Sequence, residues 1–298
     1  MFTCARWTEI AHWAAMNFTF YLVPAMFIIL FFLERRFPLR RAKSPLKSRL
    51  VVNAVVSAIA IAVALVVVRP IAMRVLRLAS DNDWGLSTVI ATNPAVQAIL
   101  VFLLMDLSFY YWHRANHAWP LLWRFHNAHH IDPDLDVTTA VRFHFVEIAY
   151  SSVFRVLQVI AIGGPAWVFV AYETVFQVNT YMQHSNLRLP IGFERWLSLM
   201  VVTPRMHAIH HGKRFHETNS NWSTVLSVWD RLHRTLRLNV PQSRIDVGIA
   251  GYSLPGDNTV GAVMAMPFQK QRNYWHDDVT GPEVSCRQNR AIQSRMAE

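Results

Sequence analysis

The chain has 298 residues, of which 53% are hydrophobic and 16% are charged, and its formal net charge is +10. The mean hydropathy is positive, and this balance is typical of an integral membrane protein rather than of a soluble domain. The basic character is not accompanied by a motif for binding RNA or DNA. The two cysteines, Cys4 and Cys286, lie near opposite ends of the sequence, so thiolate metal ligation and a disulfide framework are both unsupported.

Three apolar stretches in the first half of the chain predict membrane-spanning helices. Residues 13–33 contain no charged residue, nor do residues 50–68, and each stretch approaches the roughly 20 residues that cross a bilayer core. A third span is predicted to begin at Pro94, a residue suited to the first helical turn, and to run to Trp112. The first stretch does not fit a cleaved signal peptide, because its apolar run is long and no small-residue cleavage site follows.

Two further apolar segments, 143–162 and 165–181, predict a helical hairpin that turns at Gly163 and Gly164. The hairpin either crosses the bilayer or dips into it and returns, because charged residues interrupt both segments. After the hairpin, residues 191–200 predict a short amphipathic helix at the membrane interface. Its charged residues, Glu194 and Arg195, are expected on the side facing water.

The connection between the first two predicted spans, residues 34–49, is strongly basic. By the positive-inside rule such a short loop stays in the cytoplasm, and basic residues near a bilayer also attract anionic lipid headgroups. The N-terminus then lies outside, and the third span returns to the cytoplasm just before His113. We therefore expect the histidine-rich segments to face the cytoplasm if residues 143–184 form a complete hairpin. The basic residues are Arg35, Arg36, Arg40, Arg41, Lys43, Lys47 and Arg49.

These segments predict an all-α integral membrane protein with four to five membrane helices and a cytoplasmic, histidine-rich helical cap. We divide the chain into N-terminal membrane helices (residues 1–93), a catalytic domain (94–240) and a cytoplasmic tail (241–298). The tail is predicted to be extended and partly disordered, above all from Phe268 onward, because glycine, proline and polar residues dominate it.

Histidines form the most informative pattern in this sequence. Ten of the fourteen lie between residues 113 and 211, in the clusters HRANH, HNAHH and HAIHH and at two positions between them. Neutral imidazole is a good ligand for transition metals, and this spacing recurs too often for an ordinary protein surface. The candidate metal ligands are His113, His117, His126, His129, His130, His144, His184, His207, His210 and His211.

Helical spacing predicts how these ligands are shared between ions. His113 and His117 lie four residues apart, so both can reach one ion. In each triplet the first two histidines are expected to share a face, and the third lies about 100° further round, where it suits a second ion. His184 ends a polar stripe on an apolar segment and is a ninth ligand. His144 is either a tenth ligand or part of a charge network.

Carboxylates inside the apolar segments are the candidate supporting residues. Asp106 lies two helical turns before His113, and an aspartate in a membrane helix is costly and usually functional. We expect it to accept a hydrogen bond from a ligand imidazole or to steer that helix; the alternative is a structural cap or an interhelical contact. Glu147 and Glu173 are placed in the same supporting role.

The identity of the metal does not follow from the ligands alone. Clustered neutral nitrogens with open positions suit iron, which activates O2, although copper and zinc generally bind such sites more tightly. A zinc protease would carry HExxH on a helix, whereas HETNS at His216 lacks the second histidine. Four other histidines are expected to make ordinary contacts: His12, His216, His233 and His276.

Four stretches resemble the fatty acid hydroxylase superfamily, and within it bacterial sterol desaturase family proteins. The first is DLSFYYWHRANHAWPLLWRFHNAHHIDPDLDVTTAVRFHFVE at residues 106–147; the others are QHSN (183–186), TPRMHAIHH (203–211) and SVWDRLHRT (227–235). The resemblance covers about residues 94–240. It assigns the family's HxxxH box, its two HxxHH boxes and its intervening histidine to nine positions, namely His113, His117, His126, His129, His130, His184, His207, His210 and His211.

The resemblance implies an oxidoreductase with two Fe²⁺ ions that uses O2 as co-substrate. It would hydroxylate or desaturate a C–H bond of a sterol-like or fatty-acyl lipid. No nucleic acid is expected as a partner. Because no Rossmann fingerprint or cytochrome domain is present, the electrons would come from a ferredoxin or cytochrome b5 type protein with its reductase. The expected location is a bacterial inner membrane, with the site facing the cytoplasm.

Two other functions remain open at this point. A non-catalytic, histidine-rich metal transporter would need a continuous polar path across the bilayer. A zinc-dependent membrane hydrolase would need a general base beside the metal. The histidine boxes contain no acidic residue, although Asp132 and Asp134 lie close by.

Overall fold

The structure is a computed structural model that describes residues 4–90 and 93–275, with side chains from residue 19 onward except Ser80. Within these residues the elements are helices, and there is no β-strand. The α-helices are α1 (Cys4–Arg36), α2 (Leu46–Val63), α3 (Arg69–Asp81), α4 (Leu86–Ile90), α5 (Pro94–Ala118), α6 (Pro120–His130), α7 (Phe145–Ile162), α8 (Ala166–His184), α9 (Ile191–Leu197), α10 (Pro204–His210), α11 (Phe215–Thr218), α12 (Val228–Leu232) and α13 (Val260–Ala265). A π-helical turn, η1 (Ala64–Val68), joins α2 to α3, and the short 3₁₀ turns are η2 (Thr139–Val141), η3 (Gln242–Arg244), η4 (Ala250–Tyr252), η5 (Pro255–Asn258) and η6 (Met266–Phe268).

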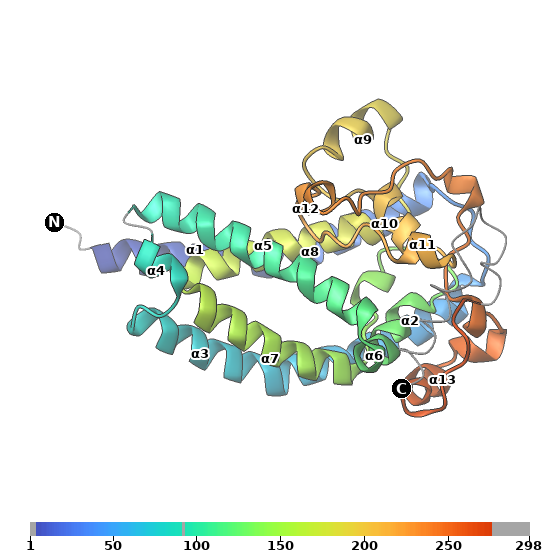
Figure 1. The fold of residues 1–298 in the computed structure, drawn as a ribbon, viewed down its shortest axis with the longest axis horizontal. Coiled ribbons are helices and arrows are strands. Elements are labelled where there is room, and N and C mark those ends of the chain that lie inside the picture. The colour runs from blue at the N-terminus through green and yellow to red at the C-terminus, as the bar shows by residue number, and fades with distance from the viewer. Residues whose placement is uncertain (1–3, 91–92, 276–298) are drawn as a thin grey trace.

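The long helices form an elongated bundle, and the short helices α9–α13 gather at one end of it, away from the marked N-terminus (Figure 1). Helix α1 packs along α8, which also contacts α5, and α7 packs against α2 and α3. We call this end the head; it consists of α6 and α9–α13 with their connections. The long apolar helices therefore extend from the head in one direction.

Three helical segments are long and apolar enough to cross a membrane, and no more are found among the described residues: Leu46–Ala79, Pro94–Ala118 and Phe145–Ile162. The second and third predicted spans are longer than the sequence pattern suggested, since α2 continues through η1 into α3 and α5 runs past Trp112 to Ala118. His113 and His117 therefore lie on the membrane helix itself. The count of four to five spans stays a prediction.

The predicted hairpin turn between α7 and α8 is confirmed. Gly163 and Gly164 have φ values of +67° and +114°, in the left-handed region that favours glycine. A Cβ atom at Gly163 would lie 1.7 Å from the carbonyl oxygen of Trp84, far inside van der Waals contact. The turn can therefore pack against the α3–α4 connection only because it has no side chain there.

Helix α9 confirms the predicted short helix but orients it differently. Glu194 is 2% exposed, and its Oε2 accepts a hydrogen bond of 2.7 Å from Nε of Arg205. Ile191 and Trp196, in contrast, are more than half exposed. The prediction that Glu194 faces water is wrong, because its ion pair with α10 turns the apolar residues outward; Arg195 is exposed, as predicted.

Residues 241–275, where the sequence predicted the start of an extended tail, pack onto the head. Ile249, Tyr252, Val263 and Met266 share a buried core with Trp123 and residues of α2 and α6. Burial of this apolar surface holds the segment in place. The remainder of the predicted tail, residues 276–298, lies outside the described residues.

Candidate metal centre

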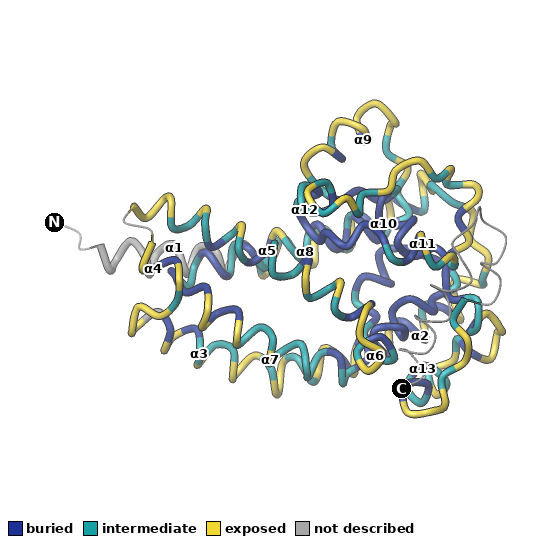
Figure 2. The backbone as a smooth tube through the Cα atoms, viewed as in Figure 1, coloured by how far each residue is buried: buried dark blue, intermediate teal, exposed yellow. Residues whose placement is uncertain are grey.

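Four helices bring the clustered histidines together in the head. Helix α5 carries HRANH at its end, α6 carries HNAHH, α8 ends at His184, and α10 carries HAIHH. Figure 2 shows α10 as buried, whereas most of α9 is exposed. The candidate ligands thus come from distant parts of the sequence and meet inside the protein.

The imidazoles form two groups of four. The first contains His113, His117, His130 and His210, and the second contains His129, His184, His207 and His211. Within each group, one nitrogen of every ring lies within 4.8 Å of those of the others. The groups adjoin, since the rings of His130 and His211 stack with centroids 4.2 Å apart.

The spacing of the second group matches metal coordination. Nε2 of His184 lies 3.0 Å from Nε2 of His129 and 2.9 Å from Nε2 of His207, and the Nε2 atoms of His207 and His211 are 3.1 Å apart. Two nitrogens bound at right angles to one ion, at bond lengths of roughly 2.1 Å, lie about 3.0 Å apart. The observed distances therefore fit ligands in adjacent positions around a single ion.

The hydrogen bonds of the outer ring nitrogens decide which nitrogen faces each group. A carbonyl oxygen only accepts, so the Nδ1 atom beside it carries the proton and Nε2 of the neutral ring is an unprotonated lone pair. Metal-binding histidines are usually held in this way. The pairs are His113 with Trp222 O (2.9 Å), His129 with Arg142 O (3.2 Å), His184 with Thr180 O (2.7 Å) and His210 with Ser220 O (2.8 Å).

Without a cation the centre would be electrostatically unfavourable. The Nε2 lone pairs of His129 and His184 face each other at 3.0 Å, and two neutral acceptors do not attract. In the first group, both ring nitrogens of His117 and of His130 are buried without a hydrogen-bond partner. A buried polar atom left unpaired costs about 1–3 kcal/mol. A bound metal ion in each group would take up one nitrogen of each ring, so the donor set fits two ions.

Burial keeps the rings in the neutral form that binds metal. Desolvation first, and then the neighbouring imidazoles, lowers the pKa of His129, His130, His207 and His211 well below the usual range. The pKa of His210 is lowered to about 3, mainly by burial. At neutral pH these side chains therefore offer lone pairs rather than charged N–H groups.

The structure corrects the predicted sharing within the triplets. His113 and His117 share a group, as expected, and His129 and His130 are divided between the two groups. In the second triplet, however, His207 groups with His211, four residues on, and not with His210. The i, i+4 pair lies on one face of α10, and the position of α8 beside that face determines which pair is used.

Two of the ten candidate histidines lie outside both groups. His126 packs beside the rings of His113 and His130, and its Nδ1 lies 2.7 Å from Oε1 of Glu147. His144 caps the start of α7, since its Nδ1 accepts from the backbone N–H of Val146. Its Nε2 lies 3.2 Å from the carbonyl oxygen of Met264, so both of its nitrogens already have partners.

The supporting carboxylates are placed differently from one another. Glu147 reaches His126, as described above. Asp106 bonds none of the histidines: its carboxylate accepts from Trp229 Nε1 at 2.7 Å and from the backbone N–H of Leu226 at 2.9 Å. It therefore makes the interhelical contact that was the alternative to an imidazole partner. Glu173 forms an ion pair of 2.7 Å with Arg155 on the apolar wall of the bundle.

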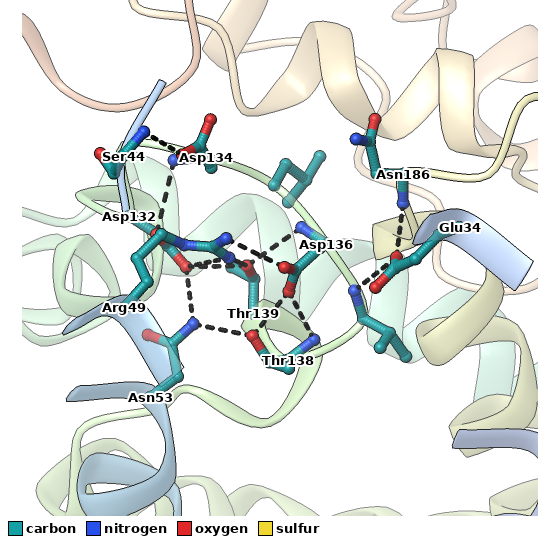
Figure 3. A network of polar contacts seen from close by, with 12 residues as sticks. Glu34, Ser44, Arg49, Asn53, Asp132, Asp134, Asp136, Thr138, Thr139 and Asn186 are labelled. Carbon is teal, nitrogen blue, oxygen red and sulfur yellow. Dashed lines mark hydrogen bonds and ion pairs between the residues drawn. The ribbon is translucent and has the colours of Figure 1, made fainter. Parts of the chain in front are cut away.

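A buried ionic network supports the second group, and sequence analysis missed its role (Figure 3). Asp132 accepts from Nε of Arg49 at 2.7 Å and from Asn53 at 2.9 Å. Arg142 lies beside it, donates to the carbonyl oxygen of Ala128, and offers its own carbonyl to His129. Although burial alone would raise it, the pKa of Asp132 is held below its usual range by the two guanidinium groups. The network fixes the segment that orients His129.

A cavity of about 390 Å³ connects the histidines with the apolar helices. Its lining includes His113, His126, His129, His184 and His207, together with apolar residues of α2, η1, α5, α7 and α8. The volume lies within the ~300–1,000 Å³ that is common for small-molecule sites. The cavity therefore offers space for an apolar chain directly beside both groups.

The fold and the site define a helical protein with candidate membrane spans, in which histidines gather at the ends of apolar helices. Known proteins with similar sequences indicate which family this is. Residues 98–235, just under half of the chain, match the profile of the family described as fatty acid hydroxylase. The chain is 31% identical to an ornithine lipid hydroxylase from Rhizobium tropici over 177 residues. These residues cover 59% of this chain and 52% of that protein. No solved structure matches the chain.

Two further relatives match over shorter stretches of the chain. An alkylglycerol monooxygenase from Xenopus tropicalis is 30% identical over 136 residues, covering 46% of this chain and 29% of that protein. A very-long-chain aldehyde decarbonylase from Oryza sativa subsp. japonica is 29% identical over 166 residues, covering 52% and 25%. The chain thus spans about half the length of the ornithine lipid hydroxylase and less than a third of the length of the other two proteins. The profile match, residues 98–235, includes the segment that carries the histidine clusters.

Proposed function

We propose that this protein is a membrane-bound, di-iron, O2-dependent oxygenase that hydroxylates or desaturates a C–H bond of a lipid. The observation that carries the proposal is the pair of adjoining four-imidazole groups, in which unprotonated Nε2 atoms face one another. Each group leaves room for further ligands if the ion is six-coordinate. The match to the fatty acid hydroxylase family supports iron, where the ligand set alone would also accept copper or zinc.

The bound iron ions would supply the activation of O2 for the balanced reaction R–H + O2 + 2 electrons + 2 protons → R–OH + H2O. The chain's residues hold and prepare the site. The backbone carbonyls on Nδ1 fix the ring orientations, and the apolar cavity walls exclude bulk water. His126 and Glu147, bonded to each other at the cavity wall, can hold or release a proton at His126 Nε2.

The substrate we propose is a lipid whose chain enters the cavity from between α2, α5, α7 and α8. The names of two relatives, an ornithine lipid hydroxylase and an alkylglycerol monooxygenase, favour a lipid with a polar headgroup. The groups lie at the ends of α5 and α8, where a carbon near such a headgroup would reach them. We further propose that the site faces the cytoplasm of a bacterial cell and that an external protein donates the electrons.

Metal analysis and oxygen consumption test the proposal together. The protein purified in detergent should contain about two iron ions per chain and consume O2 when a lipid extract and a reductant are supplied. Mass spectrometry of lipids from cells with and without the gene should reveal a gain of 16 mass units for hydroxylation or a loss of 2 for desaturation. Zinc in both groups with no oxygen consumption would refute the proposal.

The structure also bears on the two competing functions. Asp132 is occupied by Arg49 and Arg142, and Asp134 accepts from the backbone N–H groups of Lys43 and Ser44. Neither carboxylate is therefore free to act as the general base of a hydrolase. A metal transporter would move iron across vesicle membranes without consuming O2, and the same purified protein reconstituted in vesicles distinguishes that outcome.

A further inference from the structure

The connection between α1 and α2 forms a basic surface at the outer end of the head. In Figure 1 it lies at the end of the molecule opposite the marked N-terminus. Helix α1 has 33 residues, or about 50 Å at 1.5 Å per residue, and the hydrocarbon core is only ~30 Å thick. Helix α1 is therefore longer than the hydrocarbon core is thick, and the basic connection begins where α1 ends.

The same connection borders a depression of about 790 Å³. Arg35, Arg40, Arg41 and Lys43 line it, together with Glu34, Asp134 and Asp136. The carboxylates are directed into the protein (Figure 3): Glu34 accepts from two backbone N–H groups, Asp134 accepts from those of Lys43 and Ser44, and Asp136 binds Arg49. The charge left for a partner is therefore mainly positive.

Exposed basic residues extend this charge around the rim. Arg41 lines the depression, and Lys47 and Arg244 follow the lining residues Leu46 and Ser243 in the chain. All three are exposed, and none forms an ion pair within the described part of the chain. Asp246, the nearby exposed acid, is already paired with Lys43 and Lys213.

The floor of the depression lies close to the candidate metal ligands. Leu135, Ile245 and Val247 line it, and the same three residues share a buried core with Ala208 and Ile209. Ala208 and Ile209 stand between His207 and His210 on α10. The depression thus shares this apolar core with the helix that carries His207 and His210.

We propose that this basic depression is the docking surface for an acidic one-electron carrier protein. The inference rests on the proposed function, whose reaction takes up two electrons for each O2. Two carrier molecules, docking in succession, would each be oxidised by one electron, and those two electrons with two protons balance the water that forms. Complementary charge steers such partners together. Anionic lipid headgroups carry no redox group, and they are the alternative occupant that the choice of nanodisc lipid below tests.

Binding of an acidic [2Fe–2S] ferredoxin to the full-length, metal-free protein in phosphatidylcholine nanodiscs tests the proposal without turnover. The variant R41Q/K47Q/R244Q should bind about tenfold more weakly at low salt, since each exposed charge pair contributes modestly, and its affinity should depend less on salt than that of the parent. It retains five of the seven basic residues of the loop 34–49, so the signal for membrane orientation is kept.

The matched control removes three exposed basic residues elsewhere, as R195Q/R234Q/K270Q, and should bind ferredoxin like the parent. Equal affinities for the parent and R41Q/K47Q/R244Q, or equal losses in both variants, would overturn the proposal. So would a parent that binds ferredoxin in phosphatidylcholine nanodiscs and loses it in phosphatidylglycerol nanodiscs, because lipid would then occupy the surface. Iron content and O2 consumption of the parent separately report on the proposed function.

Discussion

Replacing Asp132 with asparagine removes the central charge of the network that supports the second histidine group. Asp132 and its partners Arg49 and Arg142 have side chains that are 1%, 3% and 0% exposed, so water cannot compensate for the lost carboxylate. Breaking a buried ion pair from one side costs about 3–5 kcal/mol. Asparagine keeps one acceptor oxygen, so we expect a loss near the lower end, about 3 kcal/mol.

Chemical unfolding in detergent micelles measures this loss, and iron content shows whether it reaches the site. Displacement of the Arg142 carbonyl from His129 should also lower the metal affinity of the second group, by roughly 10–100-fold as for other outer partners of ligands. The matched control is D246N, which removes an exposed carboxylate that also has two basic partners and should cost less than about 1 kcal/mol. A D132N protein within about 0.5 kcal/mol of the parent, with two iron ions still bound, would refute the reasoning.

Three further changes probe the site. H129A should lower the iron content to about one ion per chain and abolish product formation, because it removes a ligand atom of the second group, whereas H216A, at an exposed position outside both groups, should change neither; full turnover by H129A would contradict the assignment. D106N should weaken folding by about 1–3 kcal/mol and leave metal affinity unchanged, since Asp106 bonds Trp229 and a backbone N–H rather than an imidazole; a tenfold fall in metal affinity in equilibrium titration would show otherwise. The metal-free protein should lose stability as the pH falls from about 6.5 toward about 3, the lowered pKa of His210, because the unfolded chain then binds more protons than the folded one; flat stability across this range in unfolding titrations would contradict the neutral cluster.

Most residues of the two histidine groups could be predicted from the sequence, and their distribution between the groups could not. Repetition of histidine at helical spacing identified the residues, and eight of the ten lie in the two groups. Which histidines share a group depends on how α6, α8 and α10 pack against each other, and a local pattern contains no information on that. His144 illustrates the limit, because its spacing resembles that of a ligand while its nitrogens cap a helix and meet a carbonyl.

Charged residues were harder to place for a related physical reason. A carboxylate near a membrane has a strong need for a partner, but the sequence does not show where the partner is. Glu194 is buried and accepts a hydrogen bond from Arg205. Asp106, on α5, accepts a hydrogen bond from Trp229 on α12. Asp132 finds Arg49, which is 83 residues away in the chain. Only the folded arrangement supplies these pairings.

The arrangement of the two approaches to the histidines follows from the chemistry that the site would perform. A lipid chain needs an apolar route, and the cavity between α2, α5, α7 and α8 reaches the ligands from the membrane side. A water-soluble electron carrier would need a polar route, and the basic depression shares Leu135 and Ile245 with the core that includes Ala208 and Ile209 of α10. The depression and the cavity share no lining residue, so a substrate and a reductant that used these two openings would not have to leave in turn. A site that was reached from one side only would force the two to alternate.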